Sequence, residues 1–119
     1  MWLILALLVL DQVTKYFLAT ITNTGAAFGI LKGFNIPLLI FGLIALVVCI
    51  FFYFKDRRLR LPLTFLIAGI MGNSIDRIFF GHVRDFIDVG LFNFPIFNLA
   101  DSFNVIGVVL LIVSLWKKN

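Results

Sequence analysis

Long apolar stretches alternate with short polar ones along the chain, and their lengths predict four membrane-spanning helices. A helix needs roughly 20 apolar residues to cross the hydrocarbon core of a bilayer. Residues 34–54 contain no charged side chain and form the clearest example. The pattern therefore indicates an all-α membrane protein, a four-helix transmembrane bundle in one integral membrane domain. The predicted helices cover residues 2–20, 26–54, 61–80 and 96–116 of the domain 1–119.

The connection between the last two predicted helices departs from this pattern. Residues 81–95 are rich in glycine, asparagine and aspartate and include a proline, all of which favour turns. We expect a short extended piece there, at Asp85–Val89. Four of the six acidic residues lie between residues 72 and 104. The chemistry of the chain is therefore expected at this end of the third and fourth helices.

The composition supports a bilayer as the environment. The chain is 62% hydrophobic and only 13% charged, which leaves too little polar surface for a soluble domain of this size. A formal charge of +4 could suggest nucleic acid, but the basic residues do not form a binding face. Six of the ten cluster in one loop and at the chain end: Lys55, Arg57, Arg58, Arg60, Lys117 and Lys118. We therefore predict no binding of nucleic acid.

The same clusters predict the orientation in the membrane. Basic residues concentrate in cytoplasmic loops of membrane proteins, so we predict that both termini are cytoplasmic. The polar ends of the third and fourth helices then lie at the extracytoplasmic face. Five polar residues from separate stretches fall at that depth: Lys15, Asn23, Arg77, Asp85 and Asp101.

Acids within apolar helices need partners. Each costs about 2.5–3.5 kcal/mol at the centre of a membrane, whereas a whole fold is stabilised by only about 5–15 kcal/mol. Asp11 and Lys15 are four residues apart and share a helix face. We predict that Lys15 pairs with Asp11, and that Arg77 pairs with Asp76.

The sequence offers no obvious cation for Asp85 and Asp101 apart from Arg84, which we expect to be solvated. Two carboxylates that meet in a poorly solvated site cannot both be ionised, and they hold one proton between them. Such a pair can activate a water as a base and protonate a carbonyl as an acid. Spacing alone leaves open whether the two acids meet, or whether they have a structural or ion-conducting role.

Other hydrolytic chemistry has little support in the sequence. His82 is the only histidine and Cys49 the only cysteine, so a zinc site would need the acids as further ligands. No serine or cysteine has a base at a recognisable spacing.

Five ordered motifs identify a family resemblance. They are Asp11-Gln12-Val13-Thr14-Lys15, Asn23-Thr24-Gly25-Ala26-Ala27-Phe28, Gly72-Asn73-Ser74-Ile75-Asp76-Arg77, Gly81-His82-Val83-Arg84-Asp85-Phe86-Ile87-Asp88 and Phe97-Asn98-Leu99-Ala100-Asp101-Ser102. In this order, and over nearly the whole chain, they closely resemble the lipoprotein signal peptidases, the bacterial type II signal peptidases.

The resemblance implies an aspartic endopeptidase of the bacterial inner membrane that uses no metal or cofactor. Its substrates are prolipoproteins already carrying diacylglycerol on a cysteine, and it cuts just before that cysteine. By motif position, Asp85 and Asp101 correspond to the catalytic pair. Further positions that line or brace the site in the family are Asp11, Lys15, Asn23, Gly25, Asn73, Asp76, Arg77, Asn98 and Ala100. Other expected partners are membrane lipids and the cyclic peptide inhibitor globomycin, and the protein is expected to be a monomer.

One departure from the family is large. Its members usually carry a longer stretch between the first-helix motif and the Asn-Thr-Gly motif, which forms an extracytoplasmic sheet. Here Thr20 is followed almost at once by Asn23, and the stretch from Asp85 to Asp101 is also short. The alternatives are therefore a catalytically impaired or designed minimal version of the fold, or a small ion-conducting bundle.

Overall fold

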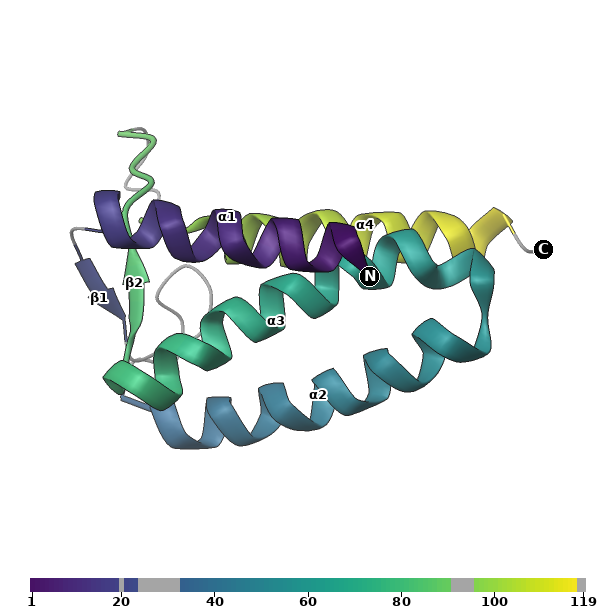
Figure 1. The fold of residues 1–119 in the computed structure, drawn as a ribbon, viewed down its shortest axis with the longest axis horizontal. Coiled ribbons are helices and arrows are strands. Elements are labelled where there is room, and N and C mark those ends of the chain that lie inside the picture. Colours follow the sequence, from purple (N-terminus) through teal and green to yellow (C-terminus); the bar gives the residue numbers. More distant parts are fainter. Residues whose placement is uncertain (20, 24–32, 91–95, 118–119) are drawn as a thin grey trace.

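The computed structural model describes residues 1–19, 21–23, 33–90 and 96–117, with the backbone alone for 21–23. It is mostly helical, as predicted (Figure 1). The helices are α1 (Trp2–Leu18), α2 (Asn35–Lys55), α3 (Arg60–Phe80) and α4 (Leu99–Lys117). Strands β1 (Ile21–Asn23) and β2 (Val83–Asp85) pair antiparallel, with Ile21 opposite Asp85. A 3-10 turn at Arg57–Leu59 joins α2 to α3.

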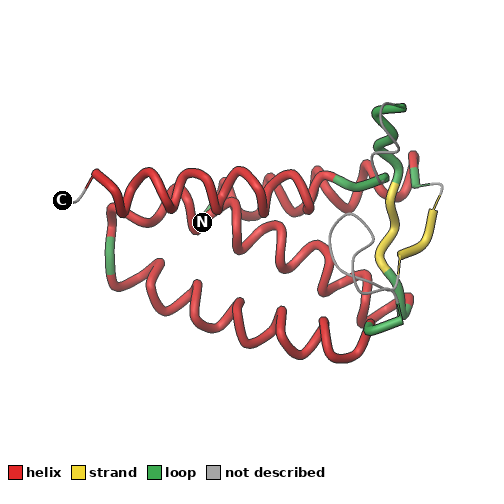
Figure 2. Tube along the Cα trace, turned by 180° about the vertical axis from the view of Figure 1, so that it is seen from behind, coloured by secondary structure: helices red, strands yellow, loops and turns green. Residues whose placement is uncertain are grey.

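Helix α3 is the centre of the bundle. It packs against α4, α2 and α1, and α1 also contacts α4. The α3–α4 contact is close because Gly107 has no side chain: a Cβ there would overlap Leu66 and approach the carbonyl of Pro62. The two strands lie at one end of the bundle, and the α2–α3 connection and the C terminus lie at the other (Figures 1 and 2).

The distribution of side chains is the reverse of that in a soluble protein. The largest fully buried side chains among the described residues are all polar: Lys15, Asn98, Asp11, Asp76, Asp85 and Asp101. Large apolar side chains lie outside instead; Trp2 is 85% exposed and Phe79 is 75% exposed. In water this arrangement would be costly, because apolar area would remain hydrated. It suits a bilayer, where polar side chains face the interior of the bundle.

Three helices of the described chain are long and apolar enough to cross a membrane. They cover Asn35–Lys55, Arg57–Phe80 and Leu99–Lys117. Helix α1 has 17 residues, which is shorter than the roughly 20 residues that a spanning helix needs. The structure and the composition together support a membrane location.

Two helix starts differ from those predicted. The second predicted helix was expected from residue 26, but α2 begins at Asn35. Gly33 has a φ of 88°, which is incompatible with a right-handed helix, and residues 26–32 lie outside the described chain. Helix α4 begins at Leu99 instead of residue 96, because Phe97 is still extended and forms an isolated antiparallel bridge with Ile87. Helices α1 and α3 lie within two residues of their predicted bounds.

Candidate active site

Asp101 is fixed at the start of α4 by reciprocal hydrogen bonds with Asn98. The backbone N–H of Asp101 donates to Asn98 Oδ1 at 2.9 Å, and the backbone N–H of Asn98 donates to Asp101 Oδ2 at 3.2 Å. Asn98 directly precedes the helix and Asp101 is its third residue, so the two form a capping box, here with Asp in the place of the usual Glu or Gln. The helix start therefore holds the carboxylate of Asp101, which is 1% exposed, in one orientation.

Asn98 also binds the second acid predicted to be catalytic. Its side-chain amide donates to Asp85 Oδ1 at 2.9 Å, and Asp85 is 2% exposed. Asp85 is the last residue of β2, which pairs with β1. The structure thus brings Asp85 and Asp101 to the same asparagine, which contacts one carboxylate through its side chain and the other through its backbone.

Asn73 provides a further link between these groups. Its amide nitrogen donates to Asp101 Oδ1 at 3.0 Å, and its oxygen accepts from the side chain of Asn98 at 3.1 Å. The same oxygen accepts from Lys15 Nζ at 3.1 Å. Asn73 is 5% exposed and Asn98 is fully buried. The two asparagines therefore tie α3, β2 and α4 together around the acids.

Lys15 is the centre of a buried ion cluster beside these acids. Its Nζ lies 2.8 Å from Asp11 Oδ2, which confirms the predicted pair, and 3.2 Å from Asp76 Oδ2. It also donates to the carbonyl of Gly72 at 3.2 Å. The side chains of Lys15, Asp11 and Asp76 are all fully inaccessible. Because each charge has an opposite charge within reach, the cluster can remain ionised in apolar surroundings.

Arg84 completes this cluster, and the expectation that it is solvated is wrong. Its guanidinium donates to Asp76 through two nitrogens, at 2.9 and 3.2 Å, and its side chain is only 16% exposed. It also lies over the ring of Phe80, 4.5 Å from the centroid. The ion pairs of Asp76 are therefore with Lys15 and Arg84, whereas the sequence analysis assigned that role to Arg77.

Two residues of this cluster were missed by the sequence analysis. Gln12 donates to Asp11 Oδ2 at 3.1 Å and accepts from Arg84 at 2.9 Å, so it bridges the two ends of the cluster. Gly72 lies where α1, α3 and α4 meet, since a Cβ there would overlap the Asp11 carboxylate. Both belong to motifs quoted above. The sequence signal for Gln12 was its polar side chain next to Asp11, and the signal for Gly72 was its small size one position before Asn73.

The four remaining predicted residues differ in their positions. Ala100 is fully buried, and its backbone N–H donates to Asp11 Oδ1 at 2.9 Å, which joins α1 to the first turn of α4. The backbone of Asn23 pairs with Val83 in the sheet, whereas Gly25 lies outside the described residues. Arg77 lies on α3 and, with Asn73, lines a cavity.

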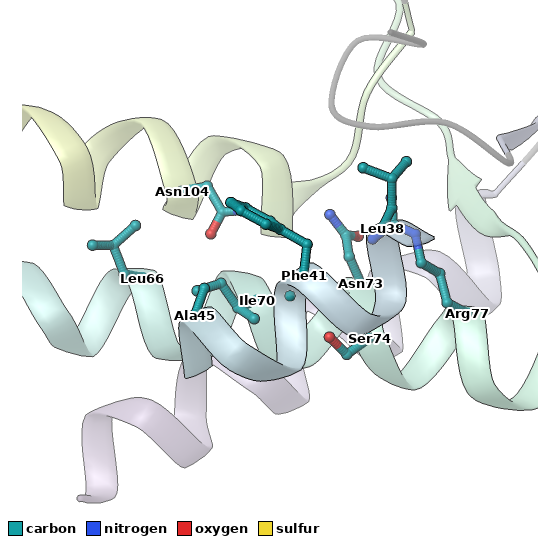
Figure 3. A pocket seen from close by; sticks show the side chains of 10 residues that line it. Leu38, Phe41, Ala45, Leu66, Ile70, Asn73, Ser74, Arg77 and Asn104 are labelled. Atoms are coloured by element: carbon teal, nitrogen blue, oxygen red, sulfur yellow. The ribbon is translucent and has the colours of Figure 1, made fainter. Parts of the chain in front are cut away.

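A cavity of about 240 Å³ opens next to this polar cluster. Asn73, Ser74 and Arg77 line it from α3, and Asn104 lines it from α4 (Figure 3). Its other walls are mostly apolar: Leu38, Phe41, Gly42, Ala45, Leu66 and Ile70. Because Asn73 binds Asp101 directly, a molecule in this cavity would lie one side chain away from a candidate catalytic acid.

The arrangement suits hydrolysis by two carboxylates and a water. Both acids are buried and fixed by amide donors, and Asp101 binds Asn73, which lines a cavity with mostly apolar walls. Such surroundings favour the sharing of one proton by two nearby carboxylates. The described residues contain no group of three or more histidine, cysteine or acidic side chains that could hold a metal ion.

Comparisons with known proteins identify related sequences and structures. Residues 3–117 match the family model described as signal peptidase (SPase) II. The lipoprotein signal peptidases of Staphylococcus aureus strains JH9 and Newman are each 41% identical over 134 residues, covering 92% of this chain and 82% of theirs. The matched length exceeds the length of this chain, so these relatives contain residues that have no counterpart here.

Two solved structures are similar over almost the whole chain. One, described as a bacterial membrane enzyme at 2.3 Å resolution, has a TM-score of 0.87 and 35% identity, covering 98% of this chain and 86% of the other. A second, also described as a bacterial membrane enzyme, at 1.9 Å resolution, has a TM-score of 0.85 and 34% identity, covering 99% and 92%.

Proposed function

This chain belongs to the signal peptidase II family, and we propose that Asp85 and Asp101 are the two acids with which it hydrolyses its substrate. It is a membrane protease that removes signal peptides from prolipoproteins. One observation carries the catalytic proposal: Asn98 binds both buried carboxylates, one through its side chain and one through its backbone. Acids held in this way are ready to act on a single water molecule.

The proposed reaction is an aspartic peptide hydrolysis. The ionised carboxylate takes a proton from water, and the water oxygen forms a bond to the scissile carbonyl carbon. The protonated carboxyl gives its proton to the carbonyl oxygen, which yields a tetrahedral diol. The carbon–nitrogen bond then breaks as the carboxyl that took the water proton gives it to the nitrogen. The other carboxylate takes the proton of one diol hydroxyl, so the acids return to their initial shared protonation.

Arg77 and Asn73 would orient the substrate. Both line the cavity, and Asn73 binds Asp101 directly. A guanidinium or amide donor directed at the scissile carbonyl stabilises negative charge that develops on its oxygen. Lys15, Asp11 and the other members of the buried ion cluster do not need to react in this mechanism. They hold α1, α3 and α4 in register.

The site would face the outside of the bacterial inner membrane. The basic residues Lys55, Arg57, Arg58 and Arg60 lie at the α2–α3 connection, opposite the strands (Figure 2). By the positive-inside rule that end is cytoplasmic, and both termini are cytoplasmic when α1 crosses as a fourth span. Apolar side chains cover α1, and the helix packs against α3 and α4, as a spanning helix would.

The proposed cut lies just before the diacylglyceryl-modified cysteine of the prolipoprotein. A cavity with mostly apolar walls from α2, α3 and α4, lined by the Asn73 that binds Asp101, suits a substrate that arrives from within the bilayer. We propose that membrane lipids surround a monomer, and that globomycin, an inhibitor expected from the family, competes with the substrate for this cavity.

A gel-shift assay with a diacylglyceryl-modified precursor tests the proposal. Asp85→Asn and Asp101→Asn should each lower cleavage at least about a hundredfold, because general acid–base catalysis contributes about 10²–10⁴-fold. Asp85→Asn should keep the unfolding temperature near that of the parent, since its oxygen still accepts from Asn98. Asp101→Asn should remain folded with a lower unfolding temperature, because its one oxygen can accept from Asn98 or from Asn73 but not from both. The matched control is Asp88→Asn, because Asp88 is an exposed acid of the same segment that accepts only a local backbone N–H in the described structure.

The three outcomes have different meanings. Normal cleavage by either variant would refute the catalytic assignment. Loss of cleavage in Asp88→Asn as well would show that the segment as a whole, and not the two acids, is sensitive. A folded parent protein that leaves the precursor intact would support the impaired version of the fold.

A further inference from the structure

Asn104 is a polar residue in an otherwise apolar part of the cavity wall. It lies on α4, three residues after Asp101, and lines the cavity opposite Phe41 and Ala45 of α2 (Figure 3). Its Oδ1 is buried and has no hydrogen-bond partner among the described residues. The oxygen instead lies in the space that a side chain on Gly69 would occupy. Neither the ion cluster nor the capping box uses it.

The packing of the bundle gives no reason for an amide at this position. An unpaired amide in apolar surroundings destabilises a fold, and an apolar side chain of the same shape would avoid that penalty. Leucine and asparagine have similar lengths, so leucine would fill the space beside Leu66 and Ile70. A ligand that brings a hydrogen-bond partner into the cavity would explain a buried amide oxygen that has none in the described structure.

We propose that the side-chain amide of Asn104 binds the peptide backbone of the signal peptide next to the cleavage site. This inference rests on the proposed function and adds a substrate contact to it. A peptidase needs its substrate extended at the scissile bond, and an extended backbone leaves N–H and C=O groups unpaired. Within a membrane these groups require partners from the protein. Asn104 offers a donor and an acceptor, and the soft χ2 torsion lets either end turn toward the cavity.

The position of Asn104 identifies the part of the substrate. Three residues along a helix correspond to about 4.5 Å, and an extended chain advances about 3.3 Å per residue. Asn104 lies farther along α4 from the strand end than Asp101 does. It should therefore contact a backbone group about one or two residues from the scissile bond, on the signal-peptide side.

The decisive variant is Asn104→Leu, measured for both cleavage kinetics and stability. We expect KM for the lipidated precursor to rise about three- to tenfold, the range of one hydrogen bond, with kcat little changed. The unfolding temperature should stay the same or rise, because an unpaired buried oxygen is removed. Asn104→Gln should raise KM less than Asn104→Leu does.

The matched control is Asn35→Leu. Asn35 also has a buried side-chain oxygen without a partner in the described structure, but it does not line the cavity. Its replacement should leave KM unchanged. A lower unfolding temperature of Asn104→Leu with unchanged KM would overturn the inference in favour of a structural role, while the proposed function would stand. A parent protein without cleavage would refute both.

A modified substrate shows whether the peptide backbone or the lipid is the binding partner of Asn104. In a depsipeptide precursor, an ester replaces one backbone amide one or two residues before the scissile bond and removes its N–H. If Asn104 binds that group, this change and Asn104→Leu should raise KM less in combination than the product of their separate effects. Independent effects at both positions would overturn the backbone contact and leave the diacylglyceryl ester groups as the partner.

Discussion

Replacing Lys15 by methionine would test whether the buried ion cluster holds the bundle together. Methionine keeps an unbranched side chain of similar length and removes the charge. Lys15 Nζ contacts Asp11 at 2.8 Å, Asp76 at 3.2 Å and Asn73 at 3.1 Å, and the residue is 1% exposed. Loss of the ammonium therefore leaves two buried carboxylates without their shared cation.

The size of the effect follows from what each carboxylate retains. Removing one partner of a buried ion pair costs about 3–5 kcal/mol. Asp76 keeps two contacts from the guanidinium of Arg84. Asp11 keeps only neutral donors among the described contacts, from Gln12 and the backbone of Ala100. We therefore expect a loss of about 3 kcal/mol, mostly from Asp11, out of a total stability of about 5–15 kcal/mol.

Unfolding by denaturant in detergent micelles measures this loss, and a second substitution tests its cause. Asp11→Asn removes the uncompensated charge while its oxygen can still accept from Ala100. Added to Lys15→Met, it should raise the stability, although Asp11→Asn alone should lower it. This change of sign is the signature of a charge pair.

Two results would refute the reasoning. A free energy of unfolding of Lys15→Met within about 0.5 kcal/mol of the parent, the usual range for a surface substitution, would mean that the cluster contributes no stability. Alternatively, Asp11→Asn could lower the stability of Lys15→Met further, which would assign the loss to packing or to the cap on α4 rather than to charge.

Three further predictions use the same protein. Asn98→Ser should keep most of the stability, because serine also caps helices, but should lose cleavage, since the amide that binds Asp85 is gone; equal unfolding midpoints with equal activity would contradict this. Gly72→Ala should lower both the unfolding midpoint and the activity, because a Cβ there overlaps the carboxylate of Asp11; denaturant unfolding and the gel-shift assay measure them. Asp56→Asn should change neither, because its partner Arg58 is largely exposed and asparagine can still accept the backbone N–H of Arg58.

The sequence predicted the helices and the Lys15–Asp11 pair well, since both depend on local spacing. Apolar length predicts a spanning helix, and a separation of four residues places two side chains on one face. The predicted starts of α2 and α4 were less accurate than the other helix ends; the helices begin at Asn35 and Leu99. They depend on the backbone conformation of Gly33 and on a bridge between Phe97 and Ile87, and neither is visible in a hydrophobic pattern.

The partners of Asp76 could not be found from spacing. Adjacent residues on a helix do not face each other, so Arg77 was a poor choice as its partner. One of its two partners, Arg84, returns to the side of α3 because Gly81 ends that helix with a left-handed φ of 74° and reverses the chain. A glycine at that position indicates a helix end, but the direction of the chain after it depends on the packing of β2.

The reciprocal hydrogen bonds at the start of α4 assign two tasks to one side chain. Under the proposed mechanism, the Asp101 carboxylate exchanges a proton in every turnover, and it also closes the first turn of the helix through the N–H of Asn98. A substitution that alters the proton affinity of Asp101 would then weaken the start of α4. A substitution that strengthens the start of α4 would in turn alter the proton affinity of Asp101. Substitutions are therefore expected mainly at the lipid-facing residues, whereas Asn98 and Asp101 can be replaced only together.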